Sequence, residues 1–189
     1  SSDLAKKLFD EAQVMLKEFV DKQTVTLNGM IAIFPANAVG DDIEIYEDES
    51  RQTVKAIFYG LRQQAERDAA TAYFCLSDFV APKESGIADY LGMFVNTAGI
   101  GLDAVVQKFK DAHDDYSYIM AEALADRLAE AFAEKLHEMV RKDFWGYSNE
   151  GNLTTEELLK VKYQGIRPAP GYPSQPDHSE KLTMWQILN

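Results

Sequence analysis

The chain has 189 residues and a formal net charge of −12, from 19 Lys and Arg against 31 Asp and Glu. A surface this acidic repels phosphate backbones and anionic lipid headgroups, so we expect neither nucleic acid nor a membrane surface as a partner. The single cysteine, Cys75, excludes an internal disulfide and a multi-cysteine zinc site. With no secretory leader and no apolar run of about 18 residues, we expect a cytoplasmic protein. The start at Ser1-Ser2 and the end inside a helix-like stretch suggest a fragment of a longer chain.

The first half of the chain predicts one helix followed by short strands. Apolar residues recur at three-to-four spacing over residues 4–21, which is typical of an amphipathic helix, and Asn28-Gly29 predicts a turn after it. A helix is also predicted near 61–70. Strands that follow one another without regular helical crossovers favour an antiparallel sheet, and therefore an α+β fold. Aromatic and β-branched content predicts five such strands: 30–34, 43–46, 54–59, 73–76 and 90–95.

The second half is mainly helical. A short helix is predicted over 102–112, and a long one over 114–144 because its apolar residues recur every fourth position. Thr154 with Glu157 forms a capping-box pattern that predicts a short helix, and Asp177 with Glu180 predicts the start of another. An acidic row along the long helix is typical of a solvated face, although one member could turn inward and accept from a ligand ammonium group. Its members are Glu122, Asp126, Glu130, Glu134 and Glu138.

Two motifs have a functional and a structural interpretation. Residues 99–104 match G-x-G-x-x-A, but the helix that follows leads into another helix, so we interpret the motif as a turn and not as a dinucleotide site. Asp111-Ala112-His113 partly matches the D-x-H-x-x-G loop of corrinoid modules. Tyr116 replaces its glycine, which favours a helix-terminal histidine. No two histidines have metal-ligand spacing, and Cys75 is expected to be a buried, inert thiol.

Residues 165–178, the proline-rich segment, contain four prolines and two glycines. The prolines are expected to hold the backbone extended. On such a support Arg167 offers a planar charged fork suited to a carboxylate, and Tyr172 offers a ring and a hydroxyl. Gly171 would let a ligand or another backbone approach closely. From these residues alone, a binding segment and a stiff connector between two helices remain equally open.

Residues 164–173, QGIRPAPGYP, resemble the R-x-x-x-G-Y signature of the activation domain of cobalamin-dependent methionine synthase. The resemblance extends over nearly the whole chain, and many separate blocks in one order are more specific than the short signature. The further blocks are FPAN at 34–37, DDI at 41–43, LRQQ at 61–64, CLSDFVAP at 75–82, HDDY at 113–116 and ALADRLAEAFAE at 123–134.

This resemblance implies a C-shaped α+β single domain over residues 1–189, built around a twisted antiparallel sheet and truncated at both ends. It implies a domain that binds S-adenosylmethionine. In the family, inert cob(II)alamin receives an electron from a flavodoxin-type protein and a methyl group from S-adenosylmethionine, which restores methylcobalamin. Arg167 would pair with the ligand carboxylate, and Glu130 lies at the position of a family carboxylate near the ligand. The rest of the ligand would be held by the backbone and side chains of Ala169, Pro170, Gly171 and Tyr172.

The resemblance also implies the partners. The parent enzyme would be a methyltransferase of methionine biosynthesis, with cobalamin and zinc in its other modules, and this chain alone would not be a complete catalyst. The expected partners are the cobalamin-binding module of the same polypeptide and a flavodoxin, and the chain is expected to be a monomer. Because flavodoxins are acidic, docking would need a local basic patch, for which Arg141-Lys142 is the candidate. The alternative is a non-catalytic interdomain docking module with weak or no ligand binding.

Overall fold

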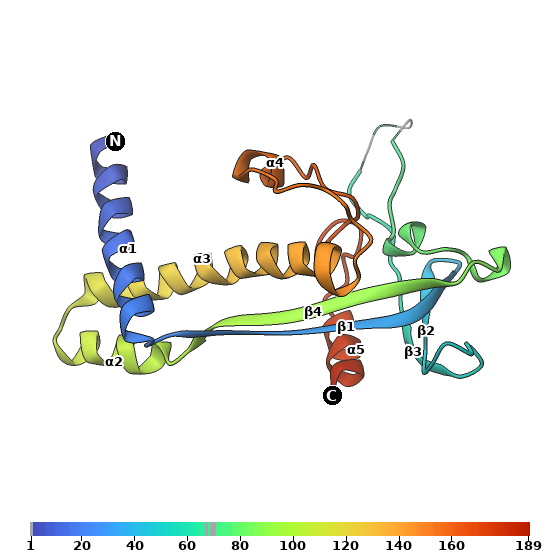
Figure 1. The fold of residues 1–189 in the computed structure, drawn as a ribbon, viewed down its shortest axis with the longest axis horizontal. Helices are drawn as coiled ribbons and strands as arrows, with labels where there is room; N and C mark the ends of the chain where they lie inside the picture. The colour runs from blue at the N-terminus through green and yellow to red at the C-terminus, as the bar shows by residue number, and fades with distance from the viewer. Residues whose placement is uncertain (1, 67, 69–70) are drawn as a thin grey trace. The chain divides into compact units, whose positions relative to one another are not determined.

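The computed structural model describes residues 2–66, 68 and 71–189. The chain divides into two compact units, and each is described here by itself. Unit 1 comprises Ser1–Met30 and Phe94–Asn149, and unit 2 comprises Ile31–Met93 and Glu150–Asn189. Two long strands, β1 (Thr26–Val39) and β4 (Asp89–Ile100), contribute residues to both units (Figure 1).

Unit 1 is mainly helical. Asp114 caps the longest helix by accepting a hydrogen bond from the Ser117 N–H at 3.0 Å. Phe19, Val106 and Ala121 form the centre of its apolar core, one from each helix. The three predicted helices are therefore confirmed. Within the described residues they are α1 (Ser2–Lys22), α2 (Leu102–Asp111) and α3 (Asp115–Met139).

The last turn of the predicted long helix widens. The helix α3 ends at Met139, and Val140–Phe144 continue it as a π-helical turn. Arg141 in this turn is fully buried, and its Nη1 lies 2.7 Å from Nδ1 of the buried His137. Because a guanidinium only donates, the His137 Nδ1 is the acceptor of this bond. The pairing keeps a charged side chain inside unit 1.

Among the described residues, four strands form one sheet in the order β3-β2-β1-β4. The central strand β2 (Asp42–Tyr46) pairs antiparallel with β1, where Ala36 faces Ile45. It also pairs antiparallel with β3 (Val54–Phe58). Gly40, at φ +63°, lies in the two-residue turn between β1 and β2. Consecutive antiparallel strands confirm the predicted α+β class (Figure 1).

The core of unit 2 lies between this sheet and the C-terminal helix α5 (Glu180–Leu188). Ile187 from α5 joins a cluster of buried strand and loop residues, with Met184 and Leu188 packed against it. The predicted capping box also forms: Thr154 and Glu157 bond reciprocally and open α4 (Thr155–Leu159). The buried members of the cluster are Ala36, Ala38, Ile43, Ile45, Phe58, Leu76, Val80, Met93 and Ile187.

Arg51 joins the strands of unit 2 at the loop between β2 and β3. Its backbone is left-handed at φ +56°, and its guanidinium carbon lies 5.7 Å from the Tyr46 ring centroid and 5.2 Å from that of Tyr90. Such cation–π contacts strengthen when they are shielded from water. The guanidinium also donates hydrogen bonds to Ala36 O (3.2 Å), Asn37 Oδ1 (2.9 Å) and Asp89 O (2.8 Å).

The predicted turn at Asn28-Gly29 is wrong, because β1 runs straight through it. Gly29 has a packing role instead: a Cβ there would lie 2.7 Å from Leu136 Cδ1 and 3.3 Å from Phe132 Cε1. The glycine therefore makes room for side chains of α3 within unit 1. A glycine placed for packing gives the same sequence signal as a glycine placed for a turn.

The predicted strand over 73–76 and the predicted helix near 61–70 are also wrong. The chain turns at Cys75, whose N–H donates to Asp78 Oδ2 at 2.9 Å, and a 3₁₀ helix follows at Leu76–Phe79. Arg62 forms ion pairs with Asp41 and Asp78, and residues 61–66 and 68 contain no helix. Residues 67, 69 and 70 of that prediction lie outside the described residues. Cys75 is buried as expected, and its thiol donates to Asp41 O.

Candidate ligand-binding segment

The proline-rich segment of unit 2 begins with a tight turn at Ala169–Tyr172. The Tyr172 N–H donates to Ala169 O at 3.0 Å, which closes the four-residue turn. Pro170 occupies the second position and Gly171, at φ +106°, the third. This is the type II arrangement, in which proline presets the first central residue and only glycine readily adopts the second.

A second turn follows directly. The Gln175 N–H donates to Tyr172 O at 2.9 Å, and the Gly171 N–H donates to Gln175 O at 2.7 Å. Tyr172 and Gln175 thereby form an antiparallel bridge with Pro173 at the corner. The prediction that the prolines hold this backbone extended is therefore wrong over 169–175. Each proline fixes only its own φ, and φ near −65° suits a turn corner as well as an extended chain.

The open side of Gly171 is occupied by the imidazole of His178. A Cβ on Gly171 would lie 2.3 Å from His178 Cε1 and 2.6 Å from Nε2, closer than atoms can approach. The close approach expected at Gly171 thus exists, but the approaching group is a side chain of the segment itself. Sequence reasoning did not assign His178 this role, because nothing in the spacing of the two residues indicates that they meet.

The helix that follows the segment is attached to the residue directly after β3. Glu180, the first residue of α5, is 4% exposed and accepts a hydrogen bond from the Tyr59 N–H at 3.2 Å. Burial raises the pKa of its carboxyl above the usual value, although hydrogen bonds to the carboxylate oppose the shift. The helix begins later than predicted: Asp177 accepts from the Ser179 N–H at 2.8 Å in the turn that precedes α5.

Three predicted binding groups lie on the segment. Tyr172 is 61% exposed, so its ring and hydroxyl face solvent. Arg167 is half-buried and Ala169 is exposed. Within the part of the chain that the structure describes, no group accepts the Ala169 N–H. Pro170, by contrast, is buried and serves as the fixed corner of the turn. A planar cation, a backbone donor and an aromatic ring therefore lie within six residues.

Glu130, the remaining predicted site residue, belongs to unit 1. It lies on α3 and its side chain is exposed, as are those of Glu122 and Asp126, which agrees with a solvated acidic face. The C-terminal end of the row differs, because Glu134 and Glu138 are half-buried. Among the six predicted site residues, the structure thus brings together five in unit 2 and leaves Glu130 in unit 1.

Glu138 is the member of the row with the strongest electrostatic environment. It pairs with Lys135 at 2.8 Å and with Lys142 at 2.9 Å. These two ammonium groups lower the pKa of Glu138 from 4.5 to about 2. The pairing also corrects the predicted basic patch, since Arg141 is buried and Lys142 is bound to Glu138. Arg141-Lys142 therefore does not present a free basic surface.

At both motifs, residues 99–104 and residues 111–113, the geometry agrees with the structural interpretation. Gly101, at φ +92°, opens α2, and a Cβ on it would lie 2.3 Å from Thr24 O. His113, at φ +55°, follows the end of α2, as expected of a helix-terminal residue. Within the described residues, no three His, Cys, Asp or Glu side chains gather as a metal site. No helix in the same residues is long and apolar enough to cross a membrane.

Comparison with known proteins identifies the family. The model of the family described as "vitamin B12 dependent methionine synthase, activation domain" matches residues 1–189. The chain belongs to this family. A solved structure entitled "Crystal Structure of the MetH Reactivation Domain bound to AdoHcy" is similar at 54% sequence identity and a TM-score of 0.90. The match covers 97% of this activation-domain chain and 56% of the solved chain, so our chain spans little more than half of that relative's length.

Proposed function

We propose that this activation domain binds S-adenosylmethionine and its product S-adenosylhomocysteine through the proline-rich segment. The observation that carries the proposal is the bound AdoHcy in a relative that is 54% identical over 97% of this chain. The residues proposed to contact or shape the ligand site are Arg167, Ala169, Pro170, Gly171 and Tyr172.

The groups on the segment fit the chemistry of this ligand. Its methionyl or homocysteinyl part carries a carboxylate, which the Arg167 guanidinium can bind through two parallel hydrogen bonds. The Ala169 N–H is a further donor, and the exposed Tyr172 ring can lie against an apolar or aromatic part of the ligand. When bound, S-adenosylmethionine supplies an electrophilic methyl group on its sulfonium. The chain's own contribution is to hold and orient the ligand.

Calorimetric titration with S-adenosylhomocysteine tests the proposal. Loss of a charge-assisted pair costs about 1.5–3 kcal/mol, so Arg167→Gln is expected to weaken binding about 10- to 150-fold. Lys162→Gln is the matched control, since it removes one exposed positive charge that lies just before the segment in the sequence. Equal affinity of Arg167→Gln and the wild type would remove Arg167 from the site.

Glu130 is a separate proposal that rests on the sequence resemblance alone. If its carboxylate takes part in binding, Glu130→Gln weakens the affinity for the ligand, whereas Glu122→Gln on the same exposed acidic face leaves it unchanged. Equal effects of the two substitutions would show only the general influence of negative charge. In that case Glu130 has no specific role in binding and is an ordinary member of the solvated acidic face.

At the level of the parent protein, we propose a role in the reductive reactivation of cobalamin in a methionine synthase, a methyltransferase. Family membership and the reactivation domain named for the relative support this role. The proposed partners are the cobalamin-binding module of the same polypeptide and a flavodoxin-type electron donor, with the chain itself monomeric. Docking of an acidic donor to a chain of charge −12 would weaken as salt is removed, which binding assays at several ionic strengths can measure.

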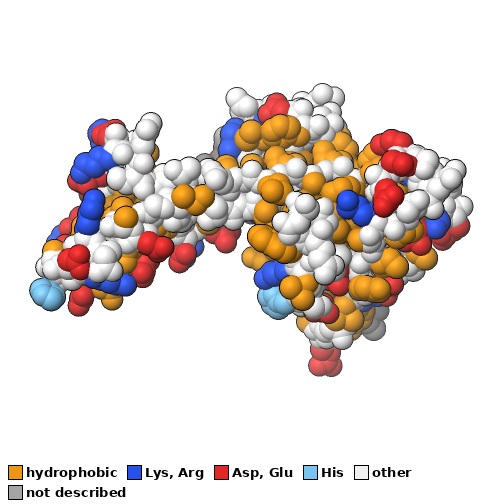
Figure 2. Space-filling view, turned by 90° about the horizontal axis from the view of Figure 1, so that it is seen from below, with side chains coloured by type: hydrophobic (Ala, Val, Ile, Leu, Met, Phe, Trp, Pro, Cys, Tyr) orange, Lys and Arg blue, Asp and Glu red, His pale blue; other side chains and the backbone are white. Residues whose placement is uncertain are grey.

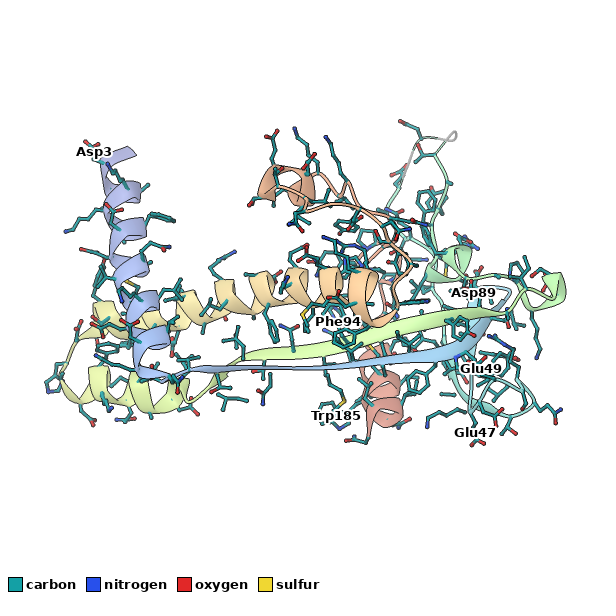
Figure 3. The ribbon with its side chains drawn as sticks, viewed as in Figure 1. Asp3, Glu47, Glu49, Asp89, Phe94 and Trp185 are labelled. Carbon is teal, nitrogen blue, oxygen red and sulfur yellow. The ribbon has the colours of Figure 1, made fainter. Side chains whose placement is uncertain are left out.

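A second candidate function is interdomain docking without ligand binding. The observation that favours it is the exposure of Leu182 and Trp185 on α5, at 69% and 64%. Figure 3 labels Trp185 on this helix. Hydrophobic side chains also reach the surface among charged ones in Figure 2. Under this alternative, S-adenosylhomocysteine does not bind, and the double variant Leu182→Ser/Trp185→Ser loses affinity for the cobalamin-binding module. Ligand binding that depends on Arg167 would favour the first function.

A further inference from the structure

We propose that His178 is a positioning residue that holds the Ala169–Tyr172 turn in its binding shape. This inference rests on the proposed function and adds to it a residue outside the R-x-x-x-G-Y signature. Its basis is the position of the His178 ring, which fills the space where a side chain on Gly171 would be.

Gly171 is the most flexible residue of the Ala169–Tyr172 turn. Pro170 and Pro173 have φ fixed by their rings, which leaves rotation about Gly171 and Tyr172. Glycine populates both left- and right-handed conformations at little cost, so φ +106° is not held by the residue itself. A rotation at Gly171 would redirect the Tyr172 side chain and the peptide on either side. Whatever restrains Gly171 therefore sets how well the segment is organised before the ligand arrives.

The imidazole of His178 adds a steric restraint to the hydrogen bond from the Gly171 N–H to Gln175 O, and the ring is itself held in place. The Lys181 ammonium lies 3.1 Å from His178 Nδ1. Because an ammonium only donates, Nδ1 accepts this bond and the neutral ring carries its proton on Nε2, the nitrogen nearer to Gly171. Two residues further along the chain, Glu180 is anchored by the Tyr59 N–H. The ring thus lies between the turn and the first turn of α5, which is attached to the sheet.

The contact also explains why the segment contains a histidine beyond its last proline. Its planar ring can lie flat on a glycine, and a ring nitrogen can take a hydrogen bond from Lys181 at the same time. A phenylalanine would keep a ring next to Gly171 and lose only the bond to Lys181. An alanine would lose both and leave Gly171 without the steric restraint.

Three variants test this role by calorimetry with S-adenosylhomocysteine. We expect His178→Ala to weaken binding at least fivefold with a thermal midpoint within about 2 °C of wild type. His178→Phe is expected to bind within twofold of wild type, because it restores the ring on Gly171. Gln186→Ala, an exposed neighbour on α5, is the matched control and is expected to leave binding unchanged.

A spectroscopic signature separates positioning from general stability. An aromatic ring against Gly171 shifts the backbone proton resonances of that residue in an ¹H–¹⁵N spectrum of the ligand-free protein. The shift is expected to be lost in His178→Ala and retained in His178→Phe. If His178→Ala lowers the thermal midpoint strongly, the positioning role is tested with His178→Phe instead, through its affinity for S-adenosylhomocysteine and its Gly171 resonances.

The outcomes distinguish this inference from the function on which it rests. If wild type binds, Arg167→Gln loses binding and His178→Ala binds within twofold of wild type, the function stands and the positioning role is overturned. A folded His178→Phe that binds as weakly as His178→Ala also overturns it. If wild type shows no binding at all, the proposed function fails and the positioning role fails with it.

Discussion

Replacing Gly171 by alanine is the perturbation whose cost the structure defines best. At φ +106° an L-residue is strained by about 1–2 kcal/mol. The added Cβ would also lie 2.3 Å from His178 Cε1, so the imidazole must move, and overpacking of this kind costs about 1–3 kcal/mol. We expect Gly171→Ala to lower the free energy of unfolding by about 2–4 kcal/mol. For a chain of this length that is about 5–15 °C in the thermal midpoint.

Two other glycines separate the contributions. Gly40 has φ +63° and no atom within 4 Å of the position of a Cβ, so Gly40→Ala reports backbone strain without overlap. Gly151 has neither a left-handed φ nor a close neighbour, and Gly151→Ala should be neutral or slightly stabilising. The expected order of destabilisation in urea or thermal unfolding is therefore Gly171→Ala, then Gly40→Ala, then Gly151→Ala.

The contribution of the ring can be isolated in a double variant. When His178 is already alanine, the overlap is gone, and adding Gly171→Ala should cost only about as much as Gly40→Ala does in the wild type. The reasoning is refuted if Gly171→Ala costs the same with and without His178. It is equally refuted if Gly171→Ala is no worse than Gly151→Ala.

Two further predictions concern charged groups outside the segment. Glu138→Gln removes a carboxylate whose pKa is lowered to about 2 by Lys135 and Lys142, so its stabilising effect is complete above the unfolded pKa near 4.5 and disappears as the pH falls toward 2. Because these groups are partly exposed, we expect a cost of about 1–2 kcal/mol at pH 7 and almost none at pH 2, measured by urea unfolding; a pH-independent difference would contradict this origin. Arg51→Lys removes a guanidinium that donates three hydrogen bonds and lies against two tyrosine rings, and is expected to cost about 2–3 kcal/mol, whereas the exposed Arg127→Lys should be neutral.

Elements with a strong local pattern could be predicted from sequence. One such pattern is the apolar residue at every fourth position of α3, and another is the capping box of Thr154 and Glu157. Both are properties of neighbouring residues, and both elements appear in the structure. The errors occur where a distant residue decides the local shape. Gly29 stays within β1 because Leu136 needs the space, and no signal near Gly29 in the sequence indicates this. The turn at Cys75 is closed by the Asp78 carboxylate, which the distant Arg62 holds through two hydrogen bonds, and this overrides an apolar run typical of a strand.

The candidate site shows the same division. Composition was enough to single out Arg167 and Tyr172 on a stiff segment, because prolines and a charged fork are visible in any sequence. Its shape could have been predicted more closely, since Pro170-Gly171 is the signature of the type II turn that the structure contains. The contact between Gly171 and His178 could not have been predicted, because it depends on the direction that the second turn gives to the chain. The sequence resemblance supplied Glu130, which no local pattern distinguishes from Glu122.

The role of Gly171 changes as a result, and with it the physical account of the segment. A small residue in a binding loop is usually interpreted as an opening through which a ligand approaches the backbone. In this chain the opening on that side is closed by the imidazole of His178, so the glycine is the point at which the segment packs against itself. The Ala169 N–H and Tyr172 then lie on two consecutive turns, just after Arg167, in which Pro170, Pro173 and Gly171 are all restrained. A segment held this way loses little conformational entropy on binding, and that saving adds to the affinity that the single Arg167 pair can provide.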